Sequence, residues 1–194
     1  MTNIATRGRP LASSREMLQE AAFELFLENT YARTSIDQIT QRAGVSRATF
    51  FNYFPAKSDV FWIDLDESLA RLGPCLAART TQPVMTAVVD ALLDIARDFG
   101  PARVPWALTH YALIGSVHEL QASAMSRLAT QARLVSSFVS GRGVPDATAR
   151  AAAYAVLGAA VAAAQDWAAA GTTRGELEPY LRAALGPVAS GFTA

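Results

Sequence analysis

The sequence predicts an all-α protein of about nine helices, with a small head followed by a larger body. Apolar residues recur at spacings of three and four through most of the chain, as they do on the buried face of a helix. Glycine and proline fall between these segments. No run alternates between apolar and polar residues, which would indicate a half-buried strand. With 51% hydrophobic residues among 194, the chain can bury a sizeable core.

Residues 1–12 form an expected basic arm. Arg7 and Arg9 flank Gly8 and precede Pro10, two residue types that discourage regular structure. Arginines on such an arm can enter the narrow minor groove of DNA, where negative potential is concentrated. A terminal tail with incidental charge fits the same residues equally well.

Residues 13–29 are predicted to be the first helix, capped by Ser13 or Ser14. The opposite face of this helix should point away from any basic surface, because it carries glutamates spaced by four. The buried face should consist of Leu18, Ala21, Ala22, Leu25 and Phe26, and the glutamates are Glu16, Glu20, Glu24 and Glu28.

Residues 34–57 read as two short helices with a tight turn between them. Ser35 lies at the N-cap position of the first. Gly44 ends that helix, because glycine adopts the left-handed conformation without steric cost. Ser46 is placed to cap the second helix. This order is typical of a helix-turn-helix.

The second helix of this pair has two distinct faces. Phe50 and Phe54 are four residues apart and should both point inward. Arg47 and Thr49, in the first turn, suit base edges and phosphates, and Lys57 follows where it could reach a phosphate. The outward face carries Arg47, Ala48, Phe51, Asn52 and Tyr53.

The stretch AGVSRATFFNYFPAKSDVF, preceded by RTSIDQIT and a long first helix, resembles the tetracycline-repressor (TetR) family of bacterial transcriptional regulators. The family usually has tyrosine where this chain has Phe51, so one hydrogen bond to DNA should be lost, while a contact with a thymine methyl group remains possible. The resemblance implies DNA contacts by Thr34, Ser35, Arg42, Ser46, Arg47, Ala48, Thr49, Tyr53 and Lys57.

Charge and composition narrow the function classes. The formal net charge is zero, but residues 1–58 hold seven basic and five acidic side chains, which leaves 17 − 7 = 10 basic and 17 − 5 = 12 acidic in the remainder.

The sequence has no nucleophile elbow, glycine-rich phosphate loop or paired Cys/His ligands, so we expect no enzyme, catalytic residue, metal or cofactor. Cys75 is the only cysteine, and the apolar run 151–164 is too short to span a bilayer. A cytoplasmic protein without membrane contact is expected.

The body should contain helices only. The first of them, 58–72, is predicted to be one continuous helix that links the head to the body, ended by Gly73-Pro74. The others are expected at residues 83–99, 106–114, 117–140, 146–170 and 176–188.

The family resemblance also implies a small-molecule pocket in the body. Trp106 and His110 share a helix face, although each candidate would also serve as an ordinary core residue. FWIDLDESLARL and LIGSVHELQAS are similar, more loosely, to the branch that includes mycofactocin-system regulators, which implies a lipophilic or acyl-type effector. The candidate ligand-binding residues are Trp62, Phe99, Trp106, His110, Tyr111, Gln121 and Met125.

The last two helices are the expected dimer interface. Family members pair through these helices into a four-helix bundle, and small side chains allow close approach, although an alanine-rich helix buried in its own subunit is equally compatible. The candidates are Ala151, Ala155, Gly158, Ala159 and Ala162, with Leu177, Leu181 and Leu185 as matching bulk.

Together these features predict a sequence-specific transcriptional regulator that binds double-stranded operator DNA, most simply a homodimeric repressor released by a ligand. Its expected parts are the arm 1–12, the DNA-binding domain 13–58, and the effector-binding and dimerisation domain 59–194. The alternative class is a helical interaction or structural bundle without specific DNA binding. A repressor without an effector, and an activator, also remain open.

Overall fold

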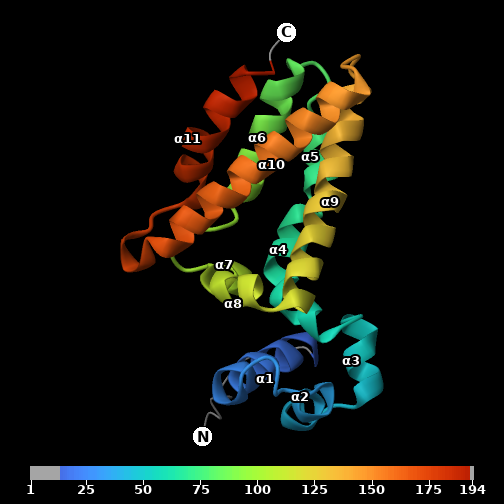
Figure 1. Ribbon diagram of the computed structural model, residues 1–194, viewed down its shortest axis with the longest axis vertical. Coiled ribbons are helices and arrows are strands. Elements are labelled where there is room, and N and C mark those ends of the chain that lie inside the picture. The colour runs from blue at the N-terminus through green and yellow to red at the C-terminus, as the bar shows by residue number, and fades with distance from the viewer. Residues whose placement is uncertain (1–13, 193–194) are drawn as a thin grey trace, which may run out of the picture. The chain divides into compact units, whose positions relative to one another are not determined.

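The computed structural model describes residues 14–192, and this part of the chain is built from helices without strands (Figure 1), which confirms the all-α class. Two 3-10 helices, η1 (Lys57–Phe61) and η2 (Gly171–Thr173), accompany the α-helices. The α-helices are α1 (Ser14–Asn29), α2 (Ile36–Ala43), α3 (Arg47–Tyr53), α4 (Ile63–Leu69), α5 (Leu72–Ala77), α6 (Val84–Ala96), α7 (Trp106–Thr109), α8 (Tyr111–Ser116), α9 (His118–Ser140), α10 (Asp146–Ala169) and α11 (Leu177–Ser190).

The chain divides into two compact units between Phe61 and Trp62, a little beyond the boundary expected after residue 58. Unit 1 contains α1, α2, α3 and η1, and unit 2 contains the remaining helices. The core of unit 1 combines the predicted stripe of α1 with side chains from α2, α3 and η1: Leu18, Ala22, Phe26, Ile39, Phe50, Phe54 and Phe61.

The turn between α2 and α3 has the predicted geometry. Ser35 forms a capping box with Gln38, in which each side chain bonds the other residue's backbone N–H. Gly44 has φ 68° and donates its N–H to the end of α2. Ser46 accepts a hydrogen bond from the N–H of Thr49 and so caps α3. These three local predictions are confirmed.

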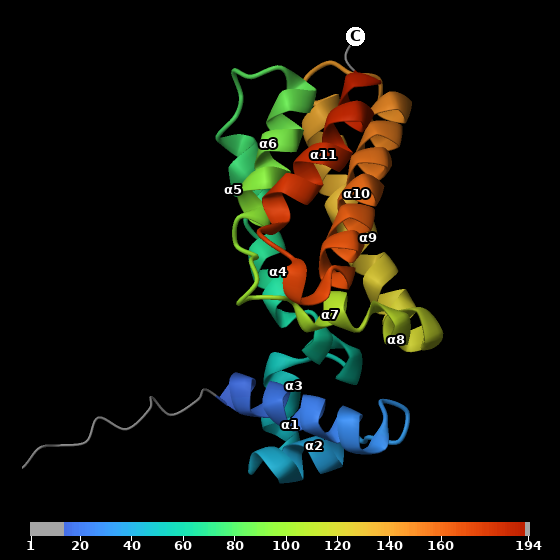
Figure 2. The same cartoon turned by 90° about the vertical axis from the view of Figure 1, so that its left-hand side faces the viewer.

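Unit 2 is a helical bundle in which α10 packs between α9 and α11, and α11 also packs on α6 (Figure 2). The buried Trp167 fixes the end of α10, because its indole N–H donates to the carbonyl of Gly175 at 2.8 Å. The central side chains include Val88, Leu92, Val135, Val156 and Leu185.

The expected continuous helix 58–72 is wrong. The chain forms η1, leaves helical geometry at Trp62 (φ −105°, ψ 1°), forms α4, and starts α5 at Leu72. Gly73 and Pro74 lie inside the first turn of α5 rather than ending a helix. Proline is tolerated there because first-turn N–H groups have no intrahelical acceptor.

The expected segment 106–114 is likewise divided at His110 into α7 and α8. These divisions are why the described residues hold eleven α-helices rather than about nine.

By length and composition α10 could cross a membrane, although core helices of soluble proteins meet the same criterion and 39% of its most apolar window is buried in unit 2. Val156 and Trp167 of this helix lie in the core, so we interpret α10 as a core helix.

Candidate nucleic-acid interface and effector cavity

The outward face of α3 is the clearest candidate for DNA contact. Phe50 and Phe54 are buried, as predicted, whereas Phe51 is 44% exposed. The short helix therefore presents one polar and aromatic face to solvent, formed by Arg47, Ala48, Phe51, Asn52 and Tyr53.

Arg47 is held in place on this face by two neighbours. Its Nη1 forms an ion pair with Asp37 of α2, and its guanidinium carbon lies 5.4 Å from the centre of the Phe51 ring. Both members of the ion pair are well exposed, and such pairs contribute only about 0–1 kcal/mol. DNA can therefore replace Asp37 as the partner of Arg47 at little cost.

Arg42, at the end of α2, binds two glutamates of α1. Its Nη1 lies 3.0 Å from Glu24 Oε2, and its Nη2 lies 2.8 Å from Glu28 Oε2. The hydrogen bond from Arg42 holds the pKa of Glu28 below its ordinary value, and the same bonds raise the pKa of Arg42. Two glutamates of the α1 stripe therefore neutralise a predicted DNA contact instead of pointing away from the basic residues.

The side chains of Thr34 and Lys57 donate hydrogen bonds to backbone carbonyls within unit 1. Thr34 is only 2% exposed, and its hydroxyl donates to the carbonyls of Leu25 and Thr30 at 3.1 and 2.8 Å. Lys57 Nζ donates to the carbonyls of Tyr31 and Thr34 at 2.9 and 2.8 Å. It also lies 4.0 Å from the centre of the Tyr31 ring. Thr34 therefore offers no accessible hydroxyl to DNA, contrary to the sequence expectation.

The predicted hydroxyl contacts are already used in helix caps. Ser35 and Ser46 accept backbone hydrogen bonds, and the hydroxyls of Ser46 and Thr49 lie 2.8 Å apart. Arg7 and Arg9 lie outside the described residues.

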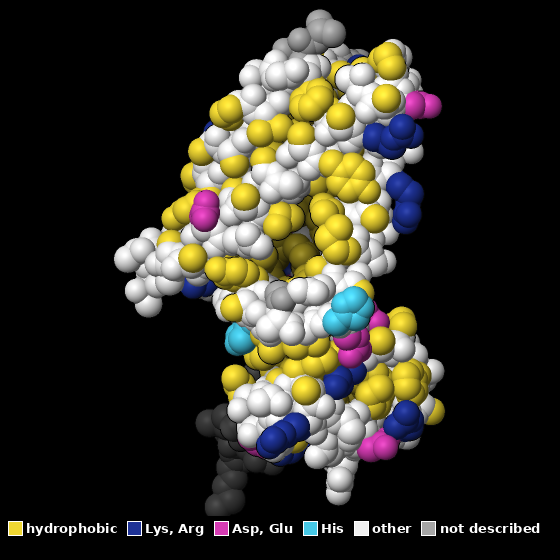
Figure 3. Space-filling model, viewed as in Figure 1, with side chains coloured by type: hydrophobic (Ala, Val, Ile, Leu, Met, Phe, Trp, Pro, Cys, Tyr) yellow, Lys and Arg dark blue, Asp and Glu magenta, His cyan; other side chains and the backbone are white. Residues whose placement is uncertain are grey.

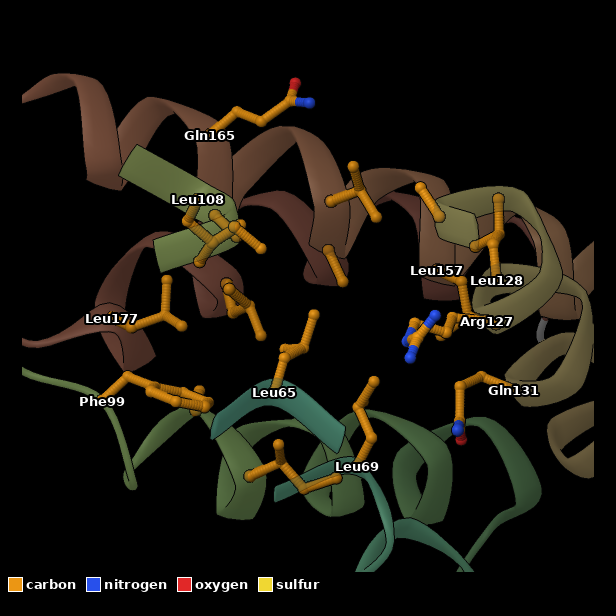
Figure 4. A pocket seen from close by; sticks show the side chains of 18 of the residues that line it. Leu65, Leu69, Phe99, Leu108, Arg127, Leu128, Gln131, Leu157, Gln165 and Leu177 are labelled. Atoms are coloured by element: carbon orange, nitrogen blue, oxygen red, sulfur yellow. The ribbon is translucent and has the colours of Figure 1, made fainter. Parts of the chain in front are cut away.

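Unit 2 contains a cavity of about 360 Å³ whose wall is almost entirely apolar. Figure 3 shows a hollow bordered by hydrophobic side chains on one face of this unit, and Figure 4 shows the lining side chains. This size and character are typical of a small-molecule site. The wall comes from α4, α6 and α7 to α11, and its members include Leu65, Leu69, Leu92, Ile95, Leu108, Ile114, Leu128, Leu157, Leu177 and Leu181.

Three polar side chains interrupt this wall: Arg127, Gln131 and Gln165. Arg127 of α9 points its guanidinium into the cavity (Figure 4) and forms a bidentate ion pair with Asp66 of α4. Both hydrogen bonds, from Nε to Oδ1 and from Nη2 to Oδ2, measure 2.8 Å. The guanidinium carbon also lies 5.0 Å from the centre of a ring of Trp62.

The structure brings together only part of the predicted ligand set. Trp62, Phe99 and Tyr111 line the cavity. Trp106 and His110 stack on each other outside it, with ring centres 3.7 Å apart. Gln121 and Met125 are exposed on α9.

The three polar lining residues were missed by the sequence reasoning. A usable signal existed for two of them, because Arg127 and Gln131 continue the apolar stripe of Leu120, Ala124 and Leu128 at helical spacing.

The candidate dimer residues separate into two groups. On α10, Ala151, Gly158 and Ala162 are exposed, and Ala155 and Ala159 are half-buried. A Cβ added to Gly158 would meet no atom within 4 Å. The three leucines of α11, by contrast, are buried in their own unit and are not presented to a partner: Leu177, Leu181 and Leu185.

The reason is the orientation of α11, which turns its leucine stripe toward the core and the cavity. Larger exposed apolar groups lie on α10 instead, at Tyr154 and Val161 on either side of Gly158. Sequence reasoning based on small residues missed both.

A helix-turn-helix unit joined to a helical body with an apolar cavity defines the class of ligand-sensing, DNA-binding regulators. Residues 18–61 match the family of bacterial regulatory proteins of the tetR type, and residues 82–193 match the MftR C-terminal domain. The chain belongs to the TetR family of transcriptional regulators.

Two relatives illustrate the range of sequence similarity. A candidate mycofactocin biosynthesis transcriptional regulator, MftR of Mycobacterium tuberculosis, is 26% identical over 163 residues, which cover 82% of each chain. The transcriptional regulator TcmR of Streptomyces glaucescens is 33% identical over 96 residues, which cover 47% of this chain and 42% of TcmR.

Solved structures share the fold at lower identity. FadR of Thermus thermophilus, a TetR-family repressor described in complex with lauroyl-CoA, has a TM-score of 0.63 and 22% identity, covering 93% of this chain and 95% of its own. NalD of Pseudomonas aeruginosa, a secondary repressor of a multidrug efflux pump, has a TM-score of 0.60 and 20% identity, covering 92% and 96%.

Family membership sets the class of function. The chain is a DNA-binding transcriptional regulator, and the alternative of a bundle without specific DNA binding is set aside. The family consists of soluble regulators that bind operator DNA as dimers and are not enzymes. Among residues 14–192, no cluster of three or more His, Cys, Asp or Glu is arranged to hold a metal ion.

Proposed function

We propose that this chain is a cytoplasmic, non-enzymatic homodimeric repressor that leaves its operator when an acyl-type, lipophilic ligand enters unit 2. The observation that carries the proposal is the apolar cavity, which lies in a different unit from the exposed face of α3. DNA binding is assigned to residues 13–58 with the arm 1–12, and effector binding and dimerisation to 59–194.

Operator recognition is assigned to the outward face of α3. Arg47 is suited to guanine, whose O6 and N7 accept two hydrogen bonds from a guanidinium. Phe51, one turn away, lies beside Arg47 on the same exposed face. The remaining proposed contacts are assigned to the phosphates of the DNA backbone. They are Ser35, Arg42, Ser46, Ala48, Thr49, Asn52 and Tyr53.

The lipophilic nature of the effector follows from the cavity wall. Burial of apolar surface contributes about 25 cal/mol per Å², so a hydrocarbon chain gains most from such a wall. The Thermus thermophilus relative described with lauroyl-CoA supports an acyl chain as the ligand.

Dimerisation is assigned to the exposed face of α10. Gly158 and its small neighbours permit close approach of a second helix, and Tyr154 and Val161 supply apolar surface for a partner to bury. A two-fold dimer suits an operator with two related half-sites.

A ligand can release the operator only through its different affinities for the DNA-bound and released arrangements, a coupling of about 1–3 kcal/mol in typical systems. The test is to select bound sequences from a random DNA library and titrate the best one with protein at several concentrations of dodecanoyl-CoA. We expect operator affinity to fall about 5- to 150-fold at saturating ligand.

An unrelated duplex of equal length is the control for charge-driven binding, since only the selected operator should respond to the ligand. A ligand that binds tightly and leaves operator affinity unchanged would contradict the release mechanism without affecting the DNA-binding assignment.

A further inference from the structure

Arg127 is the one charged side chain among the described residues that line the cavity. A guanidinium in an apolar wall is costly to bury without a partner. Here Asp66 accepts two hydrogen bonds of 2.8 Å, from Nε and Nη2, and Ser123 accepts hydrogen bonds from Nη1. Asp66 belongs to α4 and does not line the cavity, so the ion pair connects the cavity wall on α9 with a different helix.

The two partners differ in their access to water. The side chain of Arg127 is 20% exposed, whereas that of Asp66 is 41% exposed. If the pair separates, Asp66 can regain hydration and Nη1 of Arg127 keeps its hydrogen bonds to Ser123, but Nε and Nη2 stay in a largely apolar environment and need another acceptor. An anion that enters the cavity can supply that acceptor, because carboxylates and phosphates match the planar fork of arginine.

A second polar group lies one helical turn from Arg127. The amide oxygen of Gln131 is buried and accepts no hydrogen bond from the described residues. Amide oxygen and nitrogen are interchangeable by rotation, so Gln131 can present its NH₂ in place of its oxygen at this end of the cavity. An otherwise apolar cavity thus has one end with donors for an anionic head group.

We propose that the effector is an amphiphile with an anionic oxygen at its head, and that this oxygen replaces Asp66 as the partner of Arg127. The exchange breaks the ion pair between α4 and α9 and thereby signals occupancy. This inference rests on the proposed function, since it describes how the effector site acts. The chain passes from unit 1 directly into Trp62 and α4, so the helix released from α9 is the one that continues from the DNA-binding unit.

Because the ligand must replace Asp66 as the partner of Arg127, the signal depends on the charge of the ligand's head group. A neutral ligand can fill the apolar wall but offers no anion to Arg127, so Asp66 keeps its partner. It therefore binds without separating the two helices. Only a ligand whose head outcompetes Asp66 binds the two arrangements with different affinity, which is the requirement for an effector.

The experiment compares dodecanoate with dodecanol, which share a hydrocarbon chain and differ in charge. Binding to the full-length protein without DNA is followed by tryptophan fluorescence, since Trp62 lies against Arg127. Wild-type protein should bind dodecanoate at least about tenfold more tightly than dodecanol. Arg127→Met should remove this preference and leave dodecanol binding unchanged, and Arg127→Lys, which keeps the charge, should restore part of it.

Asp66→Asn tests the competitor directly. Loss of the carboxylate should tighten dodecanoate binding about tenfold without affecting dodecanol. Asp64→Asn is the matched control, because it removes a carboxylate from the same helix and should behave as wild type. An Asp66→Asn variant that binds both dodecanoate and dodecanoyl-CoA with wild-type affinity would overturn the proposal.

A third ligand, dodecanoyl-CoA, distinguishes the sources of the anion. If Arg127→Met weakens the binding of dodecanoate alone, the anion is the carboxylate of a free acid. If Arg127→Met weakens the binding of dodecanoyl-CoA alone, the anion belongs to the coenzyme portion. If neither ligand depends on Arg127, the exchange is refuted. Operator release is measured separately, so Arg127-dependent binding that leaves the operator bound contradicts the proposed function and not the anion site.

Discussion

Lys57→Met separates a structural role from a DNA contact. The sequence predicts that Lys57 neutralises a phosphate, whereas the structure gives its ammonium group two carbonyl acceptors and an aromatic ring. Methionine keeps most of the apolar stem and removes only the charge and the donors. The substitution therefore tests what the ammonium group does.

The expected loss of stability follows from these contacts. Each buried hydrogen bond from a charged donor contributes about 1.5–3 kcal/mol, and about 1 kcal/mol is expected for each of the two bonds here because Lys57 is only half-buried. The cation–π contact with Tyr31 adds roughly 0.5–1 kcal/mol. A total of about 2–3 kcal/mol corresponds to a roughly 30- to 150-fold larger open population of unit 1, at 1.4 kcal/mol for each factor of ten.

Amide hydrogen exchange of the full-length protein measures this directly. Peptides from residues 14–61 should exchange faster in Lys57→Met, while peptides from 62–192 stay unchanged. The slope of log affinity against log salt for the operator should remain at the wild-type value, because no phosphate contact is lost. Arg150→Met, which removes an exposed charge from unit 2, is the control.

The opposite outcome would refute this reasoning. If exchange in unit 1 is unchanged and the salt slope decreases in magnitude by about one, Lys57 neutralises a phosphate as the sequence predicted.

Three further substitutions and an acid titration test the remaining assignments. Arg47→Ala should lower specific binding by about 1–3 kcal/mol and relax the preference at one base pair of each half-site, as measured by library selection. Phe51→Tyr should raise operator affinity modestly, and a loss would show that the ring reads a methyl group. Gly158→Arg should yield a folded monomer by sedimentation, because its Cβ meets nothing in the subunit; a retained dimer would place the interface elsewhere. The hydrogen bond from Arg42 lowers the pKa of Glu28 below its ordinary value, so the stability that this contact adds is complete above the ordinary pKa of a glutamate and is lost as pH falls through the lowered pKa. Glu28→Gln should show no such acid-dependent loss in a thermal melt.

The turn region could be predicted from sequence because its determinants are local. The caps at Ser35 and Ser46 and the left-handed Gly44 each depend on residues within one turn of the chain. The inward direction of Phe50 follows from helical periodicity in the same way. Such features need no knowledge of distant partners.

Roles that depend on distant partners were not predictable. From the sequence, Lys57 is a reasonable candidate for a phosphate contact. Only the fold shows that the carbonyl of Tyr31 accepts a hydrogen bond from its ammonium group. The bidentate pair of Asp66 with Arg127 joins residues 61 positions apart, and neither has a local motif. Helical periodicity indicates that Leu185 is buried. It does not indicate whether the residue is covered by its own subunit or by a partner.

The continuous helix 58–72 failed for a related reason. Helical spacing alone cannot distinguish one helix from two consecutive helices that meet at an angle, since both keep the period within each part. The non-helical Trp62 is held by packing within unit 2 and is not disfavoured in a helix by its own chemistry.

The cavity is kept open largely by alanine. Besides the leucines, its wall includes five alanines from four helices, and any longer side chain there would project into the space available to a ligand. Exchange of one alanine for valine or leucine would change the length or breadth of the acceptable hydrocarbon while leaving the face of α3 unaltered. Descendants of one repressor gene could thus acquire different inducers through single substitutions and keep the same operator. The five positions are Ala96, Ala107, Ala124, Ala160 and Ala164.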